Sequence, residues 1–295
     1  MTFFLQLVVT GLSLGMIYAL VSIGVVIIIK CTNVFNIAQG HLVLMGGYLG
    51  YTFLVRFNMP IWMTLISAIL TAIAMGLLIE RLTVRPLMGQ SDLALIMMTI
   101  GLSIVLEGIV TLIWGGEYKT YHGVLPTVAL KVGGISLPSE SMIGLVVSVI
   151  IVTFLMLFFR YTKVGLAMRA TAEDLHVVQS MGIRATTVYA SSWVIASIVG
   201  VIGGILLGAV SGVMTALAEV GGKAFAVVLL GGVNSIGGAI VAGIMLGVLE
   251  NLAAGYLDPL LPTGGLANVF PYIVMIIVLI FRPNGLFGLV RIERI

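Results

Sequence analysis

Residues 160–184 read RYTKVGLAMRATAEDLHVVQSMGIR, and they form the only long polar break in an otherwise apolar chain. Six charged residues fall within these 25 positions, whereas only 8% of the whole chain is charged. Apolar segments long enough to cross a membrane lie on both sides of this break. We therefore interpret it as a segment outside the bilayer that separates two groups of membrane spans.

A short helix is predicted inside this segment. Thr171 and Asp174 have the spacing of a capping box, in which the hydroxyl accepts the Asp174 amide and the carboxylate reaches back to the Thr171 amide. The helix is therefore expected to begin at Ala172. Gly182 can adopt the left-handed conformation that ends a helix, which gives a length of about ten residues.

One face of this helix is apolar. Leu175, Val178 and Met181 recur every third residue and form a ridge, while Glu173 and Asp174 make the first turn acidic. We interpret the element as a helix that docks onto a partner outside the bilayer. An ordinary loop helix without a partner is the alternative.

The composition excludes a soluble globular fold. Hydrophobic residues make up 60% of the chain and the mean hydropathy is +1.24, so too little polar surface is available to cover a core. The length of 295 residues allows about eight crossings of roughly 20 residues each. We predict an all-α polytopic helical membrane protein with a single transmembrane domain over residues 1–295. The net charge of +3 is spread over loop ends, which argues against nucleic-acid binding.

The loops set the expected topology. Residues 160–184 contain four Lys or Arg residues, whereas residues 115–141 contain two, so the first segment is expected in the cytoplasm and the second outside. The N-terminus is then outside, because five spans precede residue 160, and Arg282, Arg291 and Arg294 hold the C-terminus in the cytoplasm. The first five spans are expected at residues 3–29, 42–55, 62–79, 93–114 and 142–159.

Polar residues follow the first span closely. Asn33, Asn36, Gln39 and His41 come before or at the start of the second span. Such side chains are costly when they face lipid, so they are expected to face the bundle interior or a water-filled cavity. A solvated turn between helices is the alternative. No second ligand stands at helical spacing from His41, so a metal site is not expected and no cofactor is assigned.

A single acid, Glu107, lies well inside the fourth span. A carboxylate there is neutral, paired or facing water. Coupling to protons or sodium in a secondary transporter is one interpretation, but without a connected set of acids an interhelical hydrogen bond is favoured. An intramembrane enzyme would need a nucleophile and base or metal ligands within the spans, and the three histidines stand at span or loop edges.

Small residues recur every fourth position in the sixth span. Such a ridge allows a second helix to pack almost in backbone contact, so this span is expected at the centre of the bundle. The ladder consists of Ser192, Ala196, Gly200, Gly204, Gly208 and Gly212.

A glycine-rich break follows. Residues 223–230 are too short to cross a core of about 30 Å, and they lead into GGVNSIGG at 231–238. Irregular backbone at membrane depth requires cover from protein or a cavity, so we predict a broken re-entrant hairpin that returns through 239–252. The GGK at 221–223 lacks the other residues of a phosphate-binding loop, so no ATP site is expected in this chain. A last span is expected at 269–281.

Several segments resemble one family of permeases. They are GLSLGMIYAL, NIAQGHLVLMGGYLGY, GLAMRATAEDLHVVQSMGI, VVLLGGVNSIGGAIVAG and RPNGLFG, which fall in that family's order between residues 11 and 288. The family is the LivH-type permease of branched-chain amino acid ABC importers, in bacterial inner membranes. In that family the segment that includes Arg169 is the coupling helix that contacts the ATPase.

This resemblance implies a transport subunit without enzymatic activity of its own. It implies a heteromer with a second related permease of the LivM type, two ATP-binding subunits and a periplasmic or extracellular substrate-binding protein, all around a chain embedded in membrane lipid. Coupling to the ATPase would fall on residues 160–184, at Arg169, Thr171, Glu173, Asp174, Leu175, Val178, Met181 and Gly182.

Two departures from the family pattern bear on the substrate. His41 stands where an acid is often found, and Asn234 stands in the glycine-rich break where glycine is usual. Branched-chain or related hydrophobic amino acids are the expected substrates, and urea, short amides or aromatic acids are the alternatives. The expected substrate path comprises Asn33, Asn36, Gln39, His41, Glu107 and Asn234.

Overall fold

The computed structural model describes residues 2–121, 129–132, 135–173, 175–180, 182–261 and 264–288. Nearly all of these residues are helical, as expected for a chain whose backbone polar groups must be satisfied inside lipid. The helices of the first half are α1 (Thr2–Thr32), α2 (Gln39–Tyr51), α3 (Ile61–Ile79), α4 (Asp92–Trp114) and α5 (Ser139–Tyr161). Those of the second half are α6 (Lys163–Glu173), α7 (Leu175–Ser180), α8 (Ala185–Ser211), α9 (Val220–Gly231), α10 (Ile236–Tyr256) and α11 (Leu266–Phe281).

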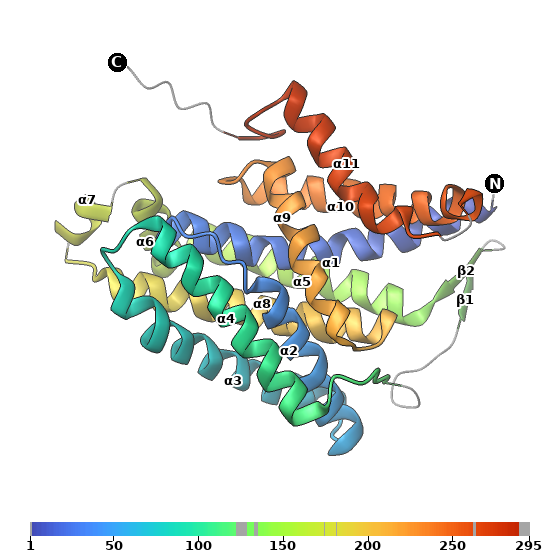
Figure 1. Ribbon diagram of the computed structural model, residues 1–295, viewed down its shortest axis with the longest axis horizontal. Coiled ribbons are helices and arrows are strands. Elements are labelled where there is room, and N and C mark those ends of the chain that lie inside the picture. The colour runs from blue at the N-terminus through green and yellow to red at the C-terminus, as the bar shows by residue number, and fades with distance from the viewer. Residues whose placement is uncertain are drawn as a thin grey trace.

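Short elements extend or connect these helices. Single π-helical turns continue α2 and α3, and the strands β1 (Ala129–Val132) and β2 (Ile135–Pro138) pair antiparallel before α5. The N-terminus and the β1–β2 hairpin lie at one end of the bundle, whereas α6 and α7 lie at the opposite end (Figure 1).

The polytopic helical membrane fold is confirmed. Six described helices, α1, α3, α4, α5, α8 and α10, are long and apolar enough to cross a membrane. The predicted number of about eight is not confirmed, because α2, α9 and α11 are shorter. The α9–α10 hairpin turns at residues 232–235, where Gly232 has a φ of 100° and the Ser235 hydroxyl caps α10 by accepting the Gly238 amide at 2.9 Å. Its returning limb has 21 residues, longer than the predicted 239–252.

Helix α1 runs through the middle of the bundle and is buried over most of its length, with α10, α8 and α5 around it (Figure 1). Its small residues face those of α10. A Cβ on Gly15 would lie 2.7 Å from the Gly243 carbonyl oxygen, and one on Gly243 would lie 2.8 Å from Ala19. The two backbones are therefore in direct contact, which any larger side chain at these positions would prevent.

The ladder on α8 packs against α2. A Cβ on Gly200 would lie 2.9 Å from the Leu42 Cβ, and one on Gly204 would collide with the Val43 carbonyl oxygen. Gly208 instead faces the Tyr121 hydroxyl. Gly212 lies beyond the end of α8 with a φ of 77°, so it terminates the helix.

The predicted start of the docking helix is wrong. The helix α6 begins nine residues before Ala172, at Lys163, and Thr171 lies in its last turn, where its hydroxyl donates to the Ala167 carbonyl at 2.8 Å. The capping hydroxyl is that of Thr162, which accepts the Gly165 amide at 3.0 Å. Asp174 and Met181 lie outside the described residues.

The second half of the segment forms the separate helix α7. Gly182 follows it with a φ of 83°, the left-handed conformation that the sequence predicts for this position. Val178 is only 1% exposed, so it packs inside this chain and does not form part of an outward ridge. Hydrophobic spacing located an apolar face on this segment but did not show whether its own bundle covers that face.

We expect Gly204→Ala to lower the free energy of unfolding by about 1 to 3 kcal/mol, because the new methyl group collides with α2 backbone. The matched control is Gly101→Ala on α4, where a Cβ would meet nothing within 4 Å and alanine favours the helix. Unfolding of the purified chain in one detergent measures both. Equal stability of the two variants would contradict the packing argument.

Candidate functional site

The loop between α1 and α2 contains a buried polar network. Asn36 and Gln39 are fully buried, and the Asn36 amide donates to the Gln39 side-chain oxygen at 3.1 Å. Gln39 in turn donates to the Ala196 carbonyl of α8 at 3.1 Å. These side chains face the bundle interior, whereas Asn33 is exposed and takes a φ of 57° as the chain turns.

The same loop is attached to α4 through Thr99. The Thr99 hydroxyl donates to the Phe35 carbonyl at 3.1 Å and accepts the Ile37 amide at 3.3 Å. A threonine in an apolar helix is common enough that sequence reasoning did not select it. Its two hydrogen bonds hold the loop between α1 and α2 against α4.

Glu107 pairs with His41 across α2 and α4. The His41 Nε2 and Glu107 Oε2 atoms are 3.4 Å apart, and the side chains are 18% and 51% exposed. A partner on another helix was expected, and the structure adds that the carboxylate is half-exposed on the outer face of α4. Depth along a span can be read from the sequence, but the direction in which the side chain faces depends on how the helices pack.

The outer face of α4 around this pair is apolar, and none of the described residues covers it. Met97, Ile104 and Leu112 are exposed on it. Gly101 and Gly108 lie on the same face, and a Cβ on either would meet nothing within 4 Å. Other glycines within the bundle, such as those of α1 and α8, face a neighbouring backbone or side chain at close range.

A second charged pair lies inside the bundle between α9 and α10. Lys223 Nζ is 2.5 Å from Glu250 Oε1, with the two side chains 12% and 8% exposed. The Tyr18 hydroxyl of α1 lies 3.3 Å from the same carboxylate oxygen, and Lys223 also donates to the Asn268 side-chain oxygen of α11 at 3.3 Å. Sequence reasoning missed this network, although two opposite charges within neighbouring apolar segments were a visible signal.

The sequence comparisons identify the family. Residues 7–279 match the family model described as "Branched-chain amino acid transport system / permease component". The chain belongs to this permease family. It is 32% identical to the high-affinity branched-chain amino acid transport system permease protein LivH of Salmonella typhimurium, over 99% of this chain and 98% of that one.

Other proteins are similar over the same extent. The permease protein BraD of Pseudomonas aeruginosa is 31% identical, over 99% of this chain and 98% of that one. A solved structure titled "PsaBC from Streptococcus pneumoniae in complex with Fab" has a TM-score of 0.49 at 17% identity and covers 93% of this chain and 90% of that one. The relatives are named as permeases, so this chain is a multi-pass membrane transport protein and not an enzyme.

The permease does not bring all the expected path residues together. Asn234 is exposed in the turn between α9 and α10, and among the described residues no hydrogen bond links it to the His41–Glu107 pair. The exposed Asn33 is likewise separate from that pair. Within the described residues, no group of three or more His, Cys, Asp or Glu side chains is arranged to hold a metal ion.

The expected coupling residues lie at one end of the permease. Arg169 and Glu173 are exposed on α6, and Arg169 donates to the Arg160 carbonyl at 3.4 Å. Leu175 is the first residue of α7. The two short helices form a projection between α5 and α8 (Figure 1).

We expect Lys223→Met to lower the free energy of unfolding by about 3 to 5 kcal/mol, because Glu250 would remain buried without its partner. The double variant Lys223→Met Glu250→Gln should recover most of that loss. Unfolding in detergent measures both, and the control is Lys119→Met, whose partner Glu117 is 76% exposed, so that losing this pair should change stability little. If Lys223→Met were as stable as this control, the buried Lys223–Glu250 pair would not stabilise the fold as argued.

Proposed function

We propose that this chain is the membrane-spanning subunit of an ATP-driven importer. The observation that carries the proposal is the α6–α7 segment, an exposed projection at one end of a bundle that belongs to a permease family. The sequence contains no phosphate-binding loop, so the energy would have to enter through a partner. A polar projection between two long spans is a suitable docking element for an ATP-binding subunit.

The proposed assembly contains four kinds of subunit. Two ATP-binding subunits contact the α6–α7 segments, a second related permease packs beside this one, and a substrate-binding protein delivers the cargo from the opposite side. The uncovered α4 face supports the second permease, because exposed glycines allow close helix approach in a membrane. A half-exposed carboxylate on that face would be costly against lipid and is better accommodated along a path between two permeases.

The proposed cargo is a branched-chain or related hydrophobic amino acid, the class named for the relatives. The His41–Glu107 pair would line its path, since a carboxylate and an imidazole can each form hydrogen bonds with the charged groups of an amino acid. Urea, short amides and aromatic acids are the alternatives within the family. Binding of each compound to the partner binding protein would distinguish them.

The proposed orientation puts α6 and α7 in the cytoplasm. The α6–α7 end of the bundle is rich in positive charge, as the positive-inside rule requires of a cytoplasmic face. The cations there are Lys30, Arg81, Arg85, Arg160, Lys163, Arg169 and Arg184, against Arg56, Lys119 and Lys131 toward the other end. The N-terminus is then outside and the C-terminus in the cytoplasm, in the inner membrane of a bacterial cell.

An ion-coupled secondary transporter is the second candidate. It is favoured by the two ionisable pairs inside the membrane, His41–Glu107 and Lys223–Glu250. Groups of this kind can carry protons in pumps and transporters. The two candidates differ in whether ATP or an ion gradient drives uptake by the chain.

We expect Gln179→Trp on α7 to abolish co-purification of the ATP-binding subunits while the permease still inserts, because the exposed position lies within the docking segment. The matched control is Gln90→Trp in the exposed turn before α4. Affinity purification of tagged permease from membranes measures the ATPase recovered. Equal recovery from both variants would contradict docking at α6–α7.

We expect Glu107→Gln to retain ATP-driven uptake within about a factor of three, because glutamine has nearly the same shape and its amide can form a hydrogen bond with the nearby His41. Uptake by Glu107→Leu should fall further, since leucine can form no hydrogen bond there. Uptake is measured in proteoliposomes with ATPase subunits, binding protein and ATP. Gradient-driven uptake by the permease alone, abolished by the glutamine variant, would instead establish the ion-coupled transporter.

A further inference from the structure

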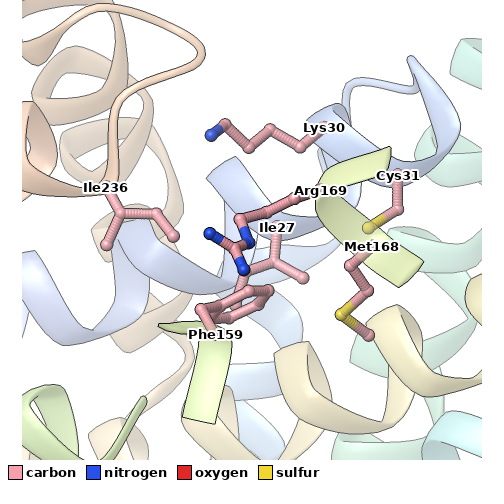
Figure 2. A pocket seen from close by; sticks show the side chains of 7 residues that line it. All are labelled: Ile27, Lys30, Cys31, Phe159, Met168, Arg169 and Ile236. Carbon is pink, nitrogen blue, oxygen red and sulfur yellow. The ribbon is translucent and has the colours of Figure 1, made fainter. Parts of the chain in front are cut away.

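A small cavity of about 40 Å³ lies where α1, α5 and α6 meet the start of α10. Two of its lining side chains are cationic and the others are apolar or weakly polar, as Figure 2 shows. The lining residues are Ile27, Lys30, Cys31, Phe159, Met168, Arg169 and Ile236. The transport function proposed above assigns no role to this cavity.

The two cations converge on it. In Figure 2 the Arg169 guanidinium lies between Phe159 and Ile236, and the Lys30 ammonium lies above it on the same side of the cavity. They are close enough for their like charges to interact unfavourably. Bringing two cations together in a partly desolvated site favours a negative charge between them.

No carboxylate of the described residues forms an ion pair with either cation. Arg169 makes one long hydrogen bond, at 3.4 Å to the Arg160 carbonyl. Glu173 attracts Lys30 electrostatically, but it forms no ion pair with it and its side chain is exposed. The guanidinium and the ammonium therefore retain most of their donors for an external anion, and these donors suit phosphate oxygens.

The apolar part of the lining identifies the kind of anion. Ile27, Phe159 and Met168 lie beside the cations, near the ends of the apolar helices α1 and α5. Basic pockets between transmembrane helices at this depth are suited to anionic lipid head groups. We propose that the cavity binds a phosphate group, and that an anionic phospholipid is the source that fits both its charged and its apolar walls.

Bound there, the phosphate would connect α6 to the end of α1 by neutralising one cation from each helix. This inference does not depend on the identity of the cargo or on the source of energy for transport. It predicts a lipid preference that persists in the purified chain, whether or not partner subunits are present.

The test uses the full chain in a neutral detergent. Native mass spectrometry compares how much of the anionic lipid dioleoyl phosphatidylglycerol and of the neutral lipid dioleoyl phosphatidylcholine the chain retains. A second experiment measures the binding of inorganic phosphate in the presence of the neutral lipid alone. We expect the anionic lipid to bind about tenfold more tightly, and Lys30→Gln Arg169→Gln to abolish that preference. The matched control Arg160→Gln Lys163→Gln removes two exposed cations of the same end and should preserve it.

Each outcome decides the proposal. Loss only in the cavity variant, without binding of inorganic phosphate, establishes a lipid head group, whereas binding of inorganic phosphate at the same residues assigns the site to soluble phosphate groups. The proposal is overturned if the unmodified chain retains the anionic and the neutral lipid equally. It is also overturned if the cavity variant and the control variant lose the anionic lipid equally. If the cavity variant does not fold, Arg169→Lys keeps the charge and must retain the preference for the proposal to stand.

Discussion

Backbone contact between glycines is the constraint on which this bundle depends. Lipid is as apolar as the helices, so hydrophobicity does not hold them together, and association relies on close packing and on hydrogen bonds. Gly15 and Gly243 bring α1 against α10, and Gly204 brings α8 against α2. Helix α1 takes part in the first contact and lies beside α8, and both helices are largely buried, as the glycine ladder led us to expect for the sixth span.

Polar contacts inside this framework fix the segments where helices are broken. The Asn36 amide donates to Gln39 and the Gln39 amide donates to the Ala196 carbonyl, while Thr99 holds the same loop against α4. Between α9 and α10, the Ser235 hydroxyl satisfies an otherwise free amide of the new helix. Irregular backbone is thus tolerated where side chains provide the hydrogen bonds that lipid cannot.

The uncovered surfaces follow from the same packing rule. A Cβ on the glycines at positions 101 and 108 of α4 would meet none of the described residues within 4 Å, and Glu107 lies beside them on the same outward face. The α6–α7 projection turns Val178 inward and exposes the charged Arg169 and Glu173 together with the apolar Val164 and Leu166. These two features are what the proposed assembly rests on, since each leaves groups that a second protein is suited to cover.

The sequence by itself determined the class of the fold, most of the span positions and the family, because these depend on hydrophobic runs and on ordered motifs along the chain. It also predicted the left-handed conformation at Gly182, a local backbone property. Tertiary structure alone decided that the small residues of α1 face those of α10, that Glu107 lies outward beside His41, and that Lys223 and Glu250 meet. The physical reason is that a hydropathy pattern records depth in the membrane, whereas rotation about each helix axis and the choice of neighbour arise only when the helices pack. The same limit misplaced the helix start, since the spacing of Thr171 and Asp174 does not show that α5 ends at Tyr161 and that the Thr162 hydroxyl caps α6.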